Sequence, residues 1–134
     1  MAIIKPFKGI RPKEGLAKMI AALPYDVINT EEAKKLAVNN KLSFLHVDKA
    51  EIDFEDINPY SEEVYLKAKE NLENLIETSY IEDDKENFYI YRQQTRNVSQ
   101  MGLVGCASVL DYEEDVIKKH ELTRREKELD RINH

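Results

Sequence analysis

The chain has 134 residues, of which 42% are hydrophobic and 34% are charged, and its formal net charge is −6 at pH 7. This length and composition predict one soluble globular domain, and the sequence contains no long apolar run of the kind that forms a transmembrane helix. A single cysteine cannot form an internal disulfide. With no signal-peptide pattern at the N-terminus, we expect a cytoplasmic protein without membrane association.

The charge is distributed unevenly along the chain. Residues 1–47 carry eight basic and four acidic side chains, residues 48–87 carry four and fourteen, and residues 88–134 carry eight and eight. A nucleic-acid-binding surface needs a continuous basic face, so the acidic middle third argues against nucleic acid as a partner. A local anion-binding site remains compatible with the first and last thirds.

The first helices and strands are short. Residues 2–7 predict a strand, and residues 8–15 predict a basic loop because glycine and proline recur there. Residues 16–23 are apolar enough for a short helix. Pro24 ends that helix, since proline lacks a backbone donor and disfavours helix in the residue before it.

The middle of the chain predicts two longer helices separated by a strand. A helix is expected from Asn29 or Thr30 to about Val38, because Asn29 and Glu32 have the spacing of a capping box. SFLHVD, residues 43–48, predicts a strand, and an acidic loop follows it. The longest helix is expected over residues 61–78, where apolar residues recur with the 3.6-residue period of one helix face.

The last third predicts an antiparallel meander followed by a helix. Residues 88–92, 101–110 and 116–122 read as its strands, with Cys106 as a small buried hydrophobic residue and DYEED as a turn. The element order favours the α+β class: a mixed sheet, with the meander in its C-terminal half, flanked by three to four helices. We expect residues 1–134 to form this single domain.

The densest group of charged residues lies at residues 118–134. Thr123 and Glu126 fit a capping box, so a helix is expected to begin at Thr123, directly after a strand. A helix N-terminus presents free N–H groups and a positive dipole end, which favour anions. Arg124 lies in the first turn of this helix. The other candidate residues are His120 and Glu121 on the incoming strand, and Thr123, Lys127, Arg131 and His134 on one helix face. The alternative is a capped, solvated helix with ion pairs such as Arg124–Glu128.

Two further positions could take part in a site. Asp26, in PYDVIN, either accepts hydrogen bonds from the following turn or binds a metal ion or a substrate hydroxyl. Arg11, in KGIRP, either belongs to an ordinary basic loop or contacts a carboxylate or phosphate. His46 is expected to be structural. One cysteine and three scattered histidines give no zinc-ligand spacing, so no metal site of that kind is predicted.

Four segments together resemble the domain-of-unknown-function family ten-fifteen of bacteria and archaea: PYDVI, FYIYRQ, GLVGCASVLDYEED and IKKHELTRREKELDR. The resemblance covers nearly the whole chain. Its most specific part is K-x-H-E-x-T-x-x-x-K-E-x-D-R, matched by Lys118, His120, Glu121, Thr123, Lys127, Glu128, Asp130 and Arg131. Asp26 matches within the Tyr-Asp-Val motif. Members of that family are usually considerably longer and carry a D-G-H-H-R-Y-E type motif downstream, which implies that this chain is an N-terminal fragment. The family is similar to the ParB/sulfiredoxin-like superfamily, which implies nucleotide binding.

Two hypotheses follow from the residues and the resemblance. In the first, the full-length protein is a phosphotransferase or nucleotide hydrolase that uses ATP or ADP with Mg²⁺ and acts on a small hydroxyl-bearing substrate; the 134 residues alone are expected to be inactive. The residues that would contact phosphate are Thr123, Arg124, Lys127, Arg131 and Arg11. His120 or Glu121 would act as the base, and Asp26 would bind the magnesium ion. In the second, the chain is a non-catalytic module that binds a small anion, or binds a protein through residues 48–87. A homodimer is compatible with either.

Overall fold

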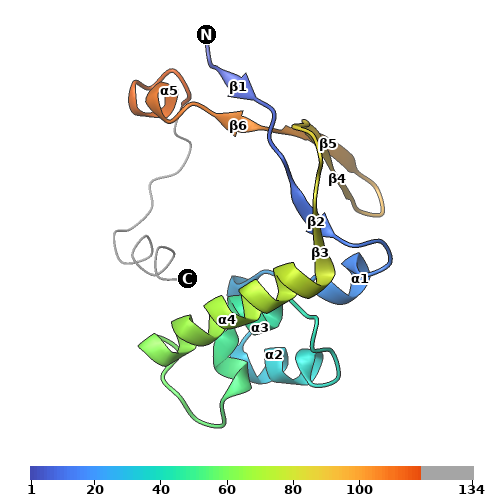
Figure 1. Ribbon diagram of the computed structural model, residues 1–134, viewed down its shortest axis with the longest axis vertical. Coiled ribbons are helices and arrows are strands. Elements are labelled where there is room, and N and C mark those ends of the chain that lie inside the picture. Colours follow the sequence, from blue (N-terminus) through green and yellow to red (C-terminus); the bar gives the residue numbers. More distant parts are fainter. Residues whose placement is uncertain (119–134) are drawn as a thin grey trace. The chain divides into compact units, whose positions relative to one another are not determined.

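The computed structural model describes residues 1–118, which mix α-helices with short strands as predicted (Figure 1). In chain order the elements are β1 (Ile4–Lys5), β2 (Ile10–Pro12), α1 (Ala17–Ile20), η1 (Tyr25–Val27), α2 (Thr30–Ala37), α3 (Leu45–Asp48), η2 (Ala50–Asp53), α4 (Glu62–Ser79), β3 (Tyr80–Glu82), β4 (Tyr89–Gln94), β5 (Ser99–Val104), β6 (Cys106–Ala107) and α5 (Val109–Glu113). Within these residues the strands form three two-stranded sheets, β1–β6, β2–β3 and β4–β5, of which the first and third are antiparallel. The prediction of one mixed sheet is therefore wrong for the described residues, because these short strands pair only two by two. No helix in this part of the chain is long and apolar enough to cross a membrane.

The described residues divide into two compact units. Arg11–Ile81 form one, here called the helical unit. Met1–Ile10 and residues 82–118 form the other, here called the strand unit. The chain passes between the units at β2 and β3. Whether residues 1–134 fold as one domain stays a prediction.

Helices α2 and α4 confirm the predictions made for them. The side-chain oxygen of Asn29 accepts a hydrogen bond from the Glu32 N–H at 2.9 Å, and the Glu32 carboxylate accepts one from the Asn29 N–H at 3.0 Å. This is the expected capping box, which satisfies two donors that the helix start would leave unpaired. Helix α4 buries Val64, Ala68 and Leu75 on one face.

The N-terminus of α4 has no side-chain cap. Ser61 occupies the N-cap position, but its side chain makes no capping hydrogen bond. Its Oγ is buried and has no partner among the described residues. The helix therefore begins where the sequence predicts, without the stabilisation that a serine cap provides.

The strand predicted at residues 43–48 is wrong, because this segment contains helix α3. Leu45 is 2% exposed and packs in a cluster with Ile28, Ala33 and Ala37. Val47 is 9% exposed and packs in a second cluster with Ile20 and Leu75. Residues two apart are thus both buried, because the single helical turn is enclosed from two sides. The resulting alternation of buried and less buried residues is the pattern that also indicates a half-buried strand.

The hairpin β4–β5 confirms two of the predicted strands. Its register runs from Tyr89 opposite Val104 to Gln94 opposite Ser99. The turn between them is closed by a hydrogen bond from the Thr95 N–H to the Val98 carbonyl at 2.8 Å.

Tyr89 connects this hairpin to the N-terminal segment. Its hydroxyl donates to Asp83 Oδ2 at 2.6 Å and accepts from the Gly9 N–H at 2.6 Å. Ionisation of the hydroxyl would remove the bond to Asp83 and place two anions side by side. This bond therefore raises the pKa of Tyr89. A Cβ on Gly9 would lie 2.5 Å from the Tyr89 hydroxyl, so any larger residue there would have to displace the Tyr89 ring.

The end of the strand unit departs from the predicted meander. Cys106 lies on the short strand β6 and is exposed, so its expected place in the core is wrong. DYEED is not a simple turn, because α5 occupies residues 109–113 and is capped by Ser108, whose side chain accepts from the Asp111 N–H. Asp111 Oδ2 in turn accepts from the Ile3 N–H at 2.7 Å.

The prediction of a third meander strand at residues 116–122 is also wrong for residues 116–118, the part of it that the structure describes. Residues 116–118 are not a strand. The chain turns at Asp115, which has a φ of 56° in the left-handed region, and the Ile117 N–H then donates to the Asp111 carbonyl at 3.0 Å. This bond folds the segment back on α5 instead of extending it. The rest of that strand and the helix expected from Thr123 lie outside the described residues.

Candidate functional site

The structure places only two of the sequence-predicted site residues. Asp26 is exposed in η1, and Arg11 is exposed on β2, where it takes part in an interaction. Outside the described residues lie His120, Glu121, Thr123, Arg124, Lys127, Arg131 and His134. Their roles stay predictions. Among residues 1–118 no group of three or more His, Cys, Asp or Glu side chains could hold a metal ion.

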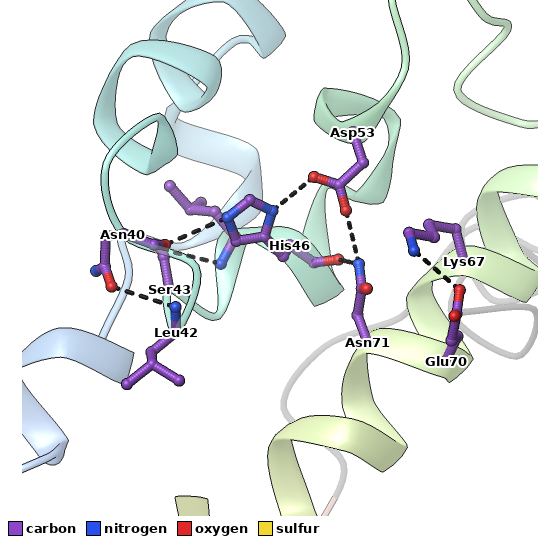
Figure 2. A network of polar contacts seen from close by, with 9 residues as sticks. Asn40, Leu42, Ser43, His46, Asp53, Lys67, Glu70 and Asn71 are labelled. Atoms are coloured by element: carbon purple, nitrogen blue, oxygen red, sulfur yellow. Dashed lines mark hydrogen bonds and ion pairs between the residues drawn. The ribbon is translucent and has the colours of Figure 1, made fainter. Parts of the chain in front are cut away.

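A different group of polar side chains converges in the helical unit, around His46 (Figure 2). His46 lies on α3, Asp53 at the end of η2, and Asn71 on α4. The His46 Nδ1 lies 2.6 Å from Asp53 Oδ1. The Asn71 Nδ2 donates to Asp53 Oδ2 at 2.8 Å and to the His46 carbonyl at 2.7 Å. Hydrogen bonds therefore join three side chains that come from three different segments of the helical unit.

Local hydrogen bonds position His46 at this point. The Asn40 side chain donates to the Met19 carbonyl at 2.6 Å and accepts from the Leu42 N–H at 3.2 Å, which shapes the turn before α3. Ser43 Oγ then accepts from the Leu45 N–H at 3.3 Å and starts the helical turn. The second ring nitrogen of His46, Nε2, faces the Asn40 carbonyl at 3.3 Å.

The electrostatics of the group are largely satisfied internally. Both carboxylate oxygens of Asp53 have a nitrogen partner, and the Asn71 amide nitrogen has two acceptors. The side chains of His46 and Asp53 are each 20% exposed, so the pair is mostly withdrawn from water yet still reachable. Such a carboxylate orients an imidazole ring and fixes which nitrogen carries the proton.

Two pockets open beside this network. The first has a volume of about 280 Å³ and lies between the α3 region and α4, with Leu42, Val47, Leu75 and Asn74 among its lining residues. The second has a volume of about 450 Å³ and lies toward α2 and the segment after η2, with Ile52 and Phe54 in its lining. Lys41, His46 and Asp53 line both pockets. We call the first the His46 pocket.

The comparison with protein families gives a match over residues 4–134, to the family described as "Protein of unknown function (DUF1015)". The chain belongs to the DUF1015 family. This confirms the resemblance drawn from its four motif segments. No curated protein and no solved structure matches the chain.

In this DUF1015 chain, sequence reasoning missed the His46 network although one signal was visible. Positions 64, 68, 71 and 75 form a continuous stripe on one face of a helix, and three of them are apolar and buried. Asn71 interrupts that stripe with an amide. A polar residue on a core-facing stripe needs a buried partner. The identity of that partner could not be found from spacing, because His46 and Asp53 come from other segments.

Proposed function

We propose that this DUF1015 chain binds a nucleotide or another phosphate-bearing ligand through residues 118–131. In the intact protein this site serves a cytoplasmic phosphotransferase acting on a small hydroxyl-bearing substrate. The observation that carries the proposal is the composition of the segment. It holds six lysines and arginines, together with His120 and Thr123, around the capping-box pattern of Thr123 and Glu126.

The chemistry of phosphoryl transfer fits these side chains. Such transfer depends mainly on positioning and on stabilising charge on the phosphoryl oxygens. Lys127 and Arg131 lie four residues apart and would contact one ligand from the same helix face. Thr123, Arg124 and Arg11 would contribute further phosphate contacts. His120 or Glu121 supplies a base, and Asp26 supplies a carboxylate for Mg²⁺ with ATP or ADP. A ParB/sulfiredoxin-like ancestry of DUF1015 is part of this proposal.

The proposal is tested by reversing charge at the two cations. We expect Lys127→Glu with Arg131→Glu to weaken ATP or ADP binding by at least about 100-fold, since two charge-assisted hydrogen bonds are lost. The matched control is Lys18→Glu with Lys35→Glu, which makes the same charge change at exposed positions of α1 and α2. Isothermal titration of the intact protein measures both. Equal nucleotide affinity in the two double variants would contradict the role given to residues 127 and 131.

A second candidate function is a non-catalytic module that binds a basic partner through residues 48–87. What favours it is the net charge of this region, with fourteen acidic and four basic side chains. Glu62, Glu63 and Glu77 are exposed on α4, so part of that charge faces solvent. Tight nucleotide binding without turnover of any nucleoside triphosphate would favour a non-catalytic module over the enzyme, and substitutions of acidic residues in 48–87 that release a bound protein would assign the partner surface.

A further inference from the structure

We propose that the His46 pocket is a separate binding site for a small monocarboxylate with a short apolar chain. The site lies wholly within the helical unit and uses none of residues 118–131. It is therefore independent of the phosphate-binding proposal. The argument rests on which groups of the pocket already have partners and which do not.

The apolar part of the ligand would pack on a firm wall. Val47 is 9% exposed and Leu75 is 5% exposed, and both belong to one buried cluster that Leu42 packs against. These side chains are held by the core, so the wall exists before a ligand arrives. A volume of about 280 Å³ is at the lower end of ligand pockets, which suits a metabolite of a few carbon atoms.

The charged part of the ligand follows from Lys41, the pocket cation that has no ion-pair partner among the described residues. Asp53 is occupied by His46 and Asn71 through both of its oxygens. Lys41 lines the same pocket and forms no ion pair with any residue that the structure describes. A ligand that enters therefore meets an ammonium group without an ion-pair partner, beside a carboxylate whose two oxygens already have hydrogen-bond partners.

The charge of the ligand is limited to one. A single cation balances a carboxylate, whereas a dianionic phosphate would bring a second negative charge close to Asp53, where like charges repel. The exposed amide of Asn74 lines the pocket one turn after Asn71 and can donate to a carboxylate oxygen. Lys41 and Asn74 thus bind the ligand, and Asp53 and Asn71 act as positioning residues for the His46 ring.

The first experiment titrates the uniformly ¹⁵N-labelled chain with isovalerate and follows its two-dimensional NMR spectrum. We expect shifts confined to the side-chain amides of Asn71 and Asn74 and to backbone amides near Val47 and Leu75. Isovaleramide has the same shape without the charge, and we expect it to bind about fivefold more weakly, the size of a solvent-accessible ion pair. Absence of shifts at these amides, or tighter binding of inorganic phosphate there, would overturn the proposal.

The second experiment compares two lysine-to-glutamine variants, each of which removes one positive charge and leaves a polar side chain. We expect Lys41→Gln to weaken isovalerate binding about fivefold and to abolish the preference over isovaleramide. Lys35→Gln is the matched control, since Lys35 is exposed on α2 and lines neither pocket. Both positions are exposed, so neither change disturbs the core. A Lys41→Gln protein that still prefers isovalerate over isovaleramide would show that Lys41 does not hold the carboxylate.

Discussion

Replacing Asp53 by alanine tests whether the His46 network holds the helical unit together. The substitution removes the acceptor for His46 Nδ1 at 2.6 Å and for Asn71 Nδ2 at 2.8 Å. A hydrogen bond to a charged group contributes about 1.5–3 kcal/mol. Because the Asp53 side chain is 20% exposed, water can replace part of each bond. We therefore expect a loss of about 2 kcal/mol for the pair.

Thermal unfolding followed by circular dichroism measures this loss. An unfolding entropy of about 2.1 cal/mol/K per residue converts 2 kcal/mol into a decrease of roughly 7 °C in Tm for a chain of this length. Asp56→Ala is the matched control, since Asp56 is an exposed acid in the same segment, and it should melt within about 2 °C of the parent chain. Asn71→Ala combined with Asp53→Ala should cost less than the sum of the two single changes. An Asp53→Ala protein that melts with the control would refute the reasoning.

Three further predictions concern single side chains. Asn29→Ala should lower the unfolding free energy by about 1 kcal/mol in a denaturant titration, because the capping box is lost; an unchanged midpoint would contradict the capping role. Ser61→Ala should be neutral or stabilising by up to about 1 kcal/mol in the same titration, since its buried Oγ has no partner; a clear loss of stability would mean that the hydroxyl is satisfied. The pKa of Tyr89 is raised by its bond to Asp83, so the folded protein holds the hydroxyl proton more tightly than the unfolded chain does. The contribution of this bond to stability should therefore be complete below pH 10.0 and should be lost as pH rises through the folded-state pKa. Tyr89→Phe should reduce that alkaline dependence in urea titrations at several pH values, leaving the part due to Tyr80, whose pKa is raised by burial; identical pH dependence in both proteins would rule the assignment out.

The elements predicted correctly are those whose signals are local. The capping box of α2 needs only Asn29 and Glu32, which are three residues apart. The length and buried face of α4 follow from a periodic apolar pattern within one segment. Both signals lie within a few helical turns of sequence, so the position and the buried face of these helices depend little on tertiary contacts.

The errors arise where tertiary packing overrides a local pattern. In residues 43–48, alternation produced a strand prediction, but Leu45 and Val47 are buried in different clusters around one helical turn. Cys106 lies in an apolar sequence and is nevertheless exposed, because β6 pairs only with β1 among the described strands. The cap of α5 by Ser108 was visible in the sequence, but the run of acidic residues after it was interpreted as a turn.

The two candidate sites were predictable to different degrees. The proposed phosphate-binding segment at residues 118–131 is a sequence pattern and could be proposed without coordinates. The His46 pocket could not, since it requires Lys41, His46, Asp53 and Asn71 to converge from separate segments. Only the amide of Asn71 on a core-facing stripe pointed toward it.

The most direct test of nucleotide binding is a thermal-shift panel of ATP, ADP and CTP, with and without Mg²⁺, on the 134-residue chain and on the longer intact protein that is part of the proposal. A ligand present at about 100 times its Kd stabilises the folded state by about 2.7 kcal/mol, which raises Tm by several degrees in a chain of this size. The account predicts such a shift in the intact protein, and its loss in the Lys127→Glu, Arg131→Glu double variant. An intact protein whose Tm does not change with any of these nucleotides would contradict the proposal.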